Sequence, residues 1–106
     1  MNYWLDLFTP YTWERFRTHG QNISGFRPRQ RKTVFERVKQ GDRFVCYLVK
    51  LSRWCGVLEV LSDAFEDTTP IFANERDPFS IRVKVNPEIT LDFEHSVPIE
   101  IPDIWN

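Results

Sequence analysis

The spacing of apolar residues changes once along the chain, near Gly41, and no other feature of the sequence constrains the fold as much. Before this point apolar residues recur at the three- and four-residue spacing of helices, as in the pair Trp13 and Phe16. After it, runs of β-branched and aromatic residues are separated by polar turns, which is typical of strands. Because the helices come first and most strands follow, strands and helices do not alternate, and a Rossmann unit is excluded.

The first segment, YWLDLF over residues 3–8, predicts a short strand followed by a helix. Thr9 is suited to cap that helix with Pro10 at its first position, and Thr12 is the alternative cap. Gly20 supplies the stop.

A loop with Ser-Gly and Pro as its breaks is expected next, over residues 21–30. Residues 30–40 then predict a second helix, whose apolar residues lie at helical spacing and whose other faces are basic.

The second part of the chain predicts at least four short strands. Residues 42–50 and 54–62 form a hairpin joined by residues 51–53, and residues 80–93 alternate in polarity until Pro87 bends or divides them. In that alternation Ile81, Val83 and Val85 face one way and Arg82 and Lys84 the other. We therefore expect one α+β domain over residues 1–106, an open or closed β-barrel flanked by two helices.

Several function classes find no support in the sequence. It contains no phosphate-binding glycine loop, no HExxH and no GxSxG, and its two histidines, His19 and His95, are too few for most metal sites. We expect a protein without catalytic residues, metal or cofactor. The start of the chain does not resemble a secretory signal and no window is apolar enough to span a membrane, so we expect a cytoplasmic protein. Cys46 and Cys55 then fit free core thiols better than a disulfide across the hairpin.

Charge is divided unevenly along the chain. Residues 1–53 hold eleven Lys and Arg against four Asp and Glu, a net +7, whereas residues 54–106 carry a net −8. This division indicates either a charged partner or two halves that neutralise each other in the fold.

The basic residues cluster beside aromatic ones. Arginine side chains near a loop and a helix start suit phosphate, and Phe26 and Trp54 offer faces on which a base can stack. This pattern favours nucleic acid over a helix whose polar face is merely basic. The candidate phosphate-binding residues are Arg27, Arg29, Arg31, Lys32 and Arg53.

Taken in order, the segments YWLDLFTPYTWERF, SGFRPRQRKTVFERVKQGDRFVCYL, SRWCGVLEV and DPFSIRVKV resemble the EVE domain, a PUA-like family related to YTH domains. The resemblance covers roughly residues 3–100. It implies a small, twisted PUA-like β-barrel with two or more flanking helices, which takes a modified base, flipped out of its stack, into an aromatic-lined pocket. Such domains occur alone or fused to nucleases and other effectors, so the resemblance also allows a fused or separate effector protein as a partner, and oligomerisation stays open.

The resemblance also implies where the pocket lies. Its mouth is formed by the end of the first strand, the Gly-Phe-Arg loop, the Ser-Arg-Trp turn and the Asp-Pro-Phe turn. Trp54 is the leading candidate for a wall, because it starts the strand that matches the YTH pattern. The predicted base-pocket residues are Phe8, Thr9, Phe26, Ser52, Trp54, Pro78 and Phe79.

Two departures from the family pattern bear on these expectations. YTH domains place a Trp in the loop before the basic helix, where this chain has Ile23 and Phe26, so the kind of modification is not specified. The family pattern also continues past Asn106 into a segment with a Phe-Arg-Gly-Ser-like stretch that completes the barrel. We therefore expect a barrel without its C-terminal closing segment, whether the chain is trimmed, naturally short or completed by another chain.

The alternative function is a protein-interaction or regulatory domain that uses the acidic half of the chain and binds no nucleic acid. An enzyme acting on nucleotides ranks last, because no residue is a convincing general base. The sequence does not distinguish DNA from RNA as the partner.

Overall fold

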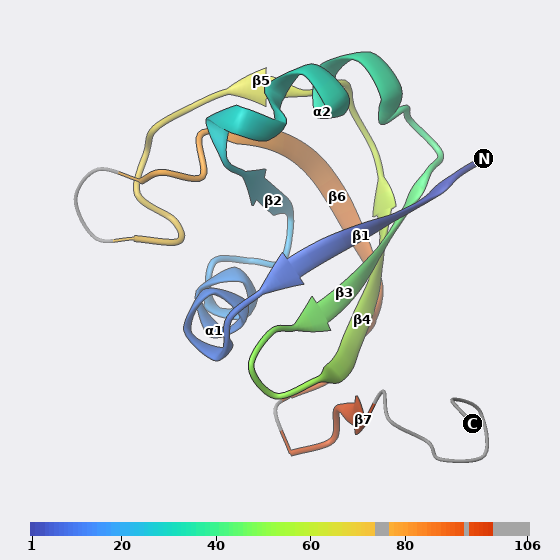
Figure 1. Cartoon of the computed structure of the whole chain (residues 1–106), viewed down its shortest axis with the longest axis vertical. Coiled ribbons are helices and arrows are strands. Elements are labelled where there is room, and N and C mark those ends of the chain that lie inside the picture. Colours follow the sequence, from blue (N-terminus) through green and yellow to red (C-terminus); the bar gives the residue numbers. More distant parts are fainter. Residues whose placement is uncertain (74–76, 93, 99–106) are drawn as a thin grey trace.

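The computed structural model describes residues 1–73, 77–92 and 94–98. In it one curled sheet with the strand order β1-β3-β4-β6-β2 is accompanied by two helices, with α2 crossing one end of the sheet and α1 lying beside the end of β1 (Figure 1). The elements are β1 (Tyr3–Phe8), α1 (Pro10–Thr18), β2 (Ile23–Phe26), a 3₁₀ turn η1 (Pro28–Gln30), α2 (Arg31–Arg37), β3 (Arg43–Leu48), β4 (Arg53–Val60), β5 (Phe65–Glu66), β6 (Ile81–Thr90) and β7 (Val97–Pro98). This is the expected α+β architecture.

The turn from β1 into α1 is fixed by a reciprocal pair of threonines. Thr9 Oγ1 accepts from the backbone N–H of Thr12 (3.0 Å), and Thr12 Oγ1 accepts from the backbone N–H of Thr9 (2.9 Å). Pro10 occupies the first helical position, where its missing N–H costs nothing. The predicted cap at Thr9 is confirmed, and Thr12 is the other member of the capping box.

The sheet curls until its two end strands approach each other. β1 pairs in parallel with β3, and the other ladders are antiparallel. Between β1 and β2, the buried hydroxyl of Ser24 donates a hydrogen bond to the buried carboxyl of Asp6. A side-chain bond therefore joins the two ends of the open barrel.

The core fills the inner face of the sheet and the adjoining side of α1. Trp13 stacks on Phe16 with ring centroids 5.2 Å apart and meets Phe8 edge-on at 4.9 Å. Phe44 and Leu58 are fully buried opposite them. Burying side chains of this size stabilises a fold by about 1.5–3 kcal/mol each, which explains the many aromatic residues in a small domain.

Long-range pairing forms two short strands that the local pattern does not indicate. Residues 23–26 lie within the expected loop but form β2, because they pair antiparallel with residues 81–84 of β6. The short β5 likewise pairs with the start of β6. Neither segment carries a strand pattern of its own, so only the partner strand reveals it.

Two expected elements differ in extent or continuity. The predicted second helix over residues 30–40 is shorter, because Val38 has an extended backbone at φ −78° and ψ 123°. Pro87 does not divide the last long strand, since β6 continues past it with a register shift opposite Val57 and Leu58. The end of the chain after β7 lies outside the described residues.

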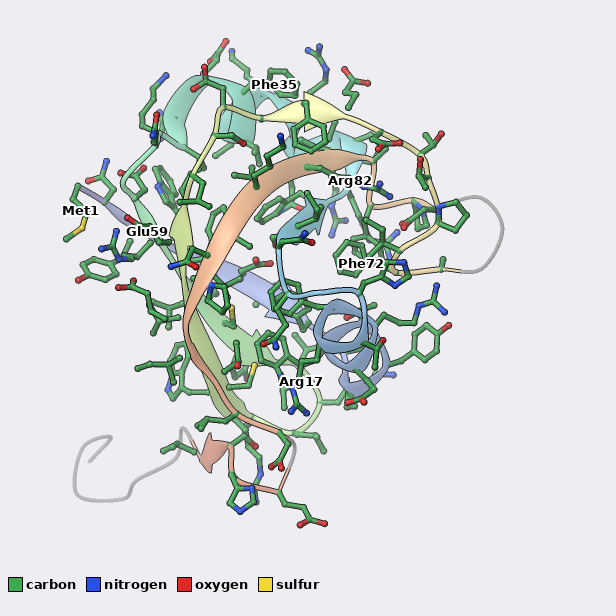
Figure 2. All side chains as sticks on the ribbon, turned by 180° about the vertical axis from the view of Figure 1, so that it is seen from behind. Met1, Arg17, Phe35, Glu59, Phe72 and Arg82 are labelled. Atoms are coloured by element: carbon green, nitrogen blue, oxygen red, sulfur yellow. The ribbon has the colours of Figure 1, made fainter. Side chains whose placement is uncertain are left out.

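The predicted alternation in β6 holds for its apolar side and fails for one cation. Ile81, Val83 and Val85 are buried and Lys84 is exposed, but Arg82 is only 1% exposed. The loop before β6 covers it (Figure 2). Cys46 and Cys55 are buried free thiols, as expected.

No helix within the described ranges is long and apolar enough to span a membrane.

Candidate nucleic-acid interface

A cavity of about 200 Å³ opens where β1 and β2 end, and we call it the mouth cavity. β1 and its capping turn contribute one side, β2 and the following η1 turn contribute the second, and the loop before β6 contributes the third. The lining residues are Leu7, Phe8, Thr9, Thr12, Gly25, Phe26, Arg27, Arg29, Gln30, Val49 and Phe79.

Two aromatic walls of the mouth cavity are anchored in the core. Phe26 is 6% exposed and packs against Phe44 with ring centroids 5.2 Å apart. Phe8 is 3% exposed and packs against Trp13. Because the core holds both rings, these walls exist before any ligand arrives, and a ligand does not have to order them.

The third aromatic wall, Phe79, is half-buried and lies under a cation. The guanidinium carbon of Arg27 is 4.8 Å from the centroid of the Phe79 ring, within the range of a cation–π contact. A flat cationic group beside an aromatic face suits both a planar ring and a phosphate.

Gly25 allows the loop that carries Phe79 to approach β2. A Cβ at position 25 would lie 2.7 Å from the ring of Phe72 and 3.0 Å from both the Cβ and the carbonyl oxygen of Phe79. The contact with Phe72 is too short to occur and those with Phe79 are unusually tight, so a side chain here would force Phe72 to shift and would press on the loop that carries Phe79. Sequence reasoning treated this glycine as a turn signal and missed this role.

A buried ion pair holds the backbone on both sides of Phe79. Asp77 Oδ1 accepts from the N–H of Phe79 (2.8 Å), and Arg82 Nε donates to its carbonyl (3.2 Å). Arg82 Nη2 lies 3.1 Å from Asp77 Oδ2 and also donates to the carbonyl of Thr69.

Asp77 organises the chain on the far side of the same loop. Its Oδ2 accepts from the N–H groups of Ile71 (3.0 Å) and Phe72 (2.8 Å). Figure 2 places Arg82 and Phe72 together between β6 and this loop. Neither Asp77 nor Arg82 lines the mouth cavity, so both act by holding its wall. From sequence, an arginine in an alternating strand is expected to be exposed. Only the loop that covers Arg82 reveals that this side chain is buried.

The predicted phosphate-binding residues do not all lie at the mouth cavity. Arg27 and Arg29 line the mouth cavity, and Lys32 is exposed nearby on α2. Arg31 is exposed but pairs with Glu66 (2.7 Å) and lies 4.5 Å from the Phe35 ring centroid. Arg53 lies at the start of β4 and donates to the carbonyl of Ser96 (2.9 Å), away from this group.

The structure does not bring Trp54 or Ser52 into the mouth cavity. The register of β3 and β4 places Trp54 opposite Tyr47, and their rings lie 5.5 Å apart. Ser52 lies in the hairpin turn at φ 54°, where its hydroxyl meets that of Tyr47 (3.4 Å). Pro78 precedes Phe79 without lining the cavity. The predicted pocket residues that do line it are Phe8, Thr9, Phe26 and Phe79.

Asp6 and Ser24 lie inside the barrel, between the strands whose ends form the mouth cavity. Complete burial raises the pKa of Asp6 to about 7, although the hydrogen bond from Ser24 opposes the shift. Burial also raises the pKa of Cys55 to about 12 and that of Cys46, with the nearby Asp6 carboxyl adding to both shifts. Near neutral pH the Asp6 carboxyl therefore takes up a proton readily, and its hydrogen bond with Ser24 joins β1 to β2.

No metal centre is evident within the described residues, since nowhere among them do three His, Cys, Asp or Glu side chains gather as ligands.

Comparison with known proteins identifies the family and the fold. The family model described as the EVE domain matches residues 2–101. The UPF0310 protein PYRAB08750 of Pyrococcus abyssi is 32% identical over 97 residues, and SSO2595 of Saccharolobus solfataricus is 30% identical over 99. These alignments cover 82% and 84% of this chain. The chain spans only 66% and 62% of the lengths of these relatives.

Solved structures share the architecture at low identity. The YTH domain of Zygosaccharomyces rouxii MRB1, in complex with N6-methyladenosine RNA, superposes with a TM-score of 0.61 at 19% identity. The match covers 83% of this chain and 58% of that one. Protein Atu2648 of Agrobacterium tumefaciens gives a TM-score of 0.59 at 22% identity, covering 93% and 68%. The chain therefore shares the fold of the YTH domains, a curled sheet accompanied by helices.

Proposed function

The chain belongs to the EVE domain family, and from that premise we propose that it is a non-catalytic module that binds nucleic acid and takes one base, turned out of its stack, into the mouth cavity. The observation that carries this proposal is the combination of three aromatic walls with two arginines around one cavity. The similarly folded YTH domain of Z. rouxii, which was solved with N6-methyladenosine RNA, supports the class of ligand.

The energetics suit a flipped base. Turning a base out of its stack costs a few kcal/mol, and stacking on an aromatic side chain returns about 1–3 kcal/mol per base. Phe26 and Phe79 provide such faces. A modified base, whose added group fills more of the cavity, is the sharper form of this proposal.

Arg27 and Arg29 are placed to contact the flanking phosphates. Both are exposed and lie on the turn that joins β2 to α2, with Lys32 one turn further along. Phosphate contacts make affinity fall steeply as salt rises, by about 0.7 unit of logarithmic slope for each contact on a single strand.

The mouth cavity offers binding groups without the groups that catalysis needs. Of the residues lining it, none is His, Cys, Asp, Glu or Lys, so no side chain there is an efficient general acid or base near neutral pH. Together with the family, this supports a binding module rather than an enzyme.

The test is titration of fluorescent single-stranded DNA and RNA oligonucleotides, with unmodified and methylated bases, at low and moderate salt. We expect salt-sensitive binding, and a logarithmic slope about 0.7 unit smaller in Arg29→Gln, the contribution of one phosphate contact on a single strand. Arg53→Gln is the matched control, because Arg53 lies apart from the mouth cavity, and its slope is expected to match the wild type. Absence of binding by the folded protein, or binding indifferent to salt, would refute the proposal.

A further inference from the structure

A second cavity of about 120 Å³ lies beside the mouth cavity, between β1 and α2, and we call it the side cavity. Nothing in the argument for a single flipped base requires it. Six of its lining residues are apolar, and the remaining two, Gln30 and Thr33, are exposed at its rim. The lining residues are Trp4, Leu5, Phe26, Gln30, Thr33, Val34, Val38 and Phe44.

The two cavities are neighbours along one strand. They share Phe26 and Gln30, which stand between them. On β1, Leu7 contributes to the mouth cavity and Leu5 to the side cavity, so the two openings are offset by roughly 7 Å, the length of two strand residues. That offset is about twice the 3.4 Å spacing of stacked bases, so an extended backbone with splayed bases is needed to span it.

The walls of the side cavity are fixed and suited to the apolar face of a flat ring. The indole N–H of Trp4 donates to Asp42 Oδ2 (2.8 Å), and the same oxygen accepts from the backbone N–H of Lys39 (3.0 Å). These bonds hold the Trp4 ring in place and occupy its polar edge. Phe44, which is fully buried, and Val34, which is 3% exposed, complete the apolar lining.

Size selects the kind of ring. An apolar protein cavity of about 150 Å³ holds one benzene molecule. The side cavity, at about 120 Å³, is therefore near the size of a single six-membered ring and small for the fused rings of a purine. The mouth cavity, at about 200 Å³, has room for the larger base.

Cations continue past the side cavity along the outer side of α2. Arg29 precedes Thr33 by four residues and Arg37 follows it by four, so the two arginines bracket the rim. Both are exposed. A strand that runs from the mouth cavity along this helix passes a positive charge on each side of the side cavity.

We infer that the side cavity holds a pyrimidine base adjacent to the base in the mouth cavity, so that the protein reads two neighbouring nucleotides. This inference rests on the proposed function, because the occupant belongs to the same strand. The shared wall of Phe26 and Gln30 separates the two bases.

The experiment compares oligonucleotides that differ only beside the target base. Each carries a pyrimidine, a purine or an abasic site at the neighbouring position, on the 5′ or the 3′ side. We expect the pyrimidine on one of these sides to bind at least fivefold more tightly than either alternative. Equal affinity for the pyrimidine and the abasic strand on both sides would overturn the inference.

A variant that fills the side cavity tests whether the pyrimidine preference arises there. Thr33→Phe adds a ring at the exposed rim and is expected to remove the pyrimidine preference. Gln40→Phe adds the same ring at an exposed position that lines neither cavity, and it is expected to keep the preference. A preference that survives in Thr33→Phe would contradict the inference.

A second readout separates this inference from the proposed function. Free uridine and thymidine are titrated at millimolar concentration while backbone amide resonances are followed. Shifts at Leu5 and Val34 that are absent in Thr33→Phe would support the side cavity even if no oligonucleotide binds, and the proposed function alone would then fail. Unchanged resonances at these positions, together with no oligonucleotide preference, would refute the inference.

Discussion

Two aromatic regions of this protein look alike in sequence and differ in structure. At the mouth cavity, Phe26 and Phe79 surround a hollow that also holds Arg27 and Arg29. On the outer face of the sheet, Tyr47 and Trp54 lie side by side across the β3–β4 ladder, and neither lines the mouth cavity or the side cavity.

The outer face is an apolar surface built by register. Leu5, Val45, Val57 and Ile89 stand opposite one another across four strands, and Leu5 and Ile89 are each about half exposed. The contrast with the mouth cavity teaches that aromatic content alone does not mark a base-binding site. The mouth cavity differs from the outer face in three respects: it is hollow, it carries arginines, and a buried ion pair supports its Phe79 wall. Each of these features can be removed by a separate substitution.

Removing the support of the wall is expected to have the largest effect. Arg82→Met leaves the buried carboxylate of Asp77 without its cation, and breaking such a pair costs about 3–5 kcal/mol. The free energy of unfolding, measured in urea, should fall by that amount. The double variant Arg82→Met/Asp77→Asn, which removes both charges, should recover part of the loss.

An ion pair on the outer face provides the matched control. Arg43 pairs there with Glu59 (3.9 Å) and with Glu88, and all three side chains are partly exposed. Arg43→Met should therefore cost about 1 kcal/mol or less. Equal losses of unfolding free energy from Arg82→Met and Arg43→Met would show that the Asp77–Arg82 pair stabilises the fold no more than a partly exposed ion pair does.

Protonation of Asp6, which lies inside the barrel beneath the mouth cavity, should make the free energy of unfolding depend on pH. The pKa of Asp6 is about 7 in the folded protein against an ordinary 3.8, so the folded state binds this proton more tightly. The resulting stability is greatest below about pH 4 and is lost as pH rises through 7, up to about 4 kcal/mol from this group. Urea titrations from pH 5 to 8 should show this decline.

Asp6→Asn isolates the contribution of that proton. An amide retains a hydrogen-bonding partner for Ser24 but does not titrate, so the variant should flatten the profile between pH 5 and 8. A decline of the same size in Asp6→Asn would assign the pH dependence to other groups.

Replacing one aromatic residue in each region compares the two directly, with the smallest expected effect. Phe79→Leu removes a stacking face at the mouth and should weaken oligonucleotide binding by about 1–3 kcal/mol. Trp54→Leu should change the dissociation constant less than twofold, because Trp54 does not line the mouth cavity. The reverse ranking would move the binding site to the outer face.

Local patterns were sufficient to predict much of the fold and part of the site. Capping by Thr9, the β3–β4 hairpin and the apolar alternation of β6 depend on neighbours in sequence, and all three are confirmed. Phe26 and Arg27 could likewise be named as site candidates, because both belong to the short Gly-Phe-Arg segment.

The remainder depends on contacts between distant segments. β2 exists because β6 pairs with it, and Arg82 is buried because the loop before its strand covers it. Trp54 was expected at the mouth, but its side of the sheet follows from a register shift between Cys46 and Tyr47. Gly56, a glycine inside the strand, is the local sign of such an irregularity, but it does not specify on which side of the sheet Trp54 lies.

The most direct test of the base-binding mouth is a map of amide chemical shifts in the ¹⁵N-labelled protein during titration with a short oligonucleotide. We predict that Gly25, Phe26, Arg27 and Phe79 shift most, while Tyr47 and Trp54 stay near their free positions. Shifts centred on Tyr47 and Trp54, with the mouth cavity unchanged, would contradict the account.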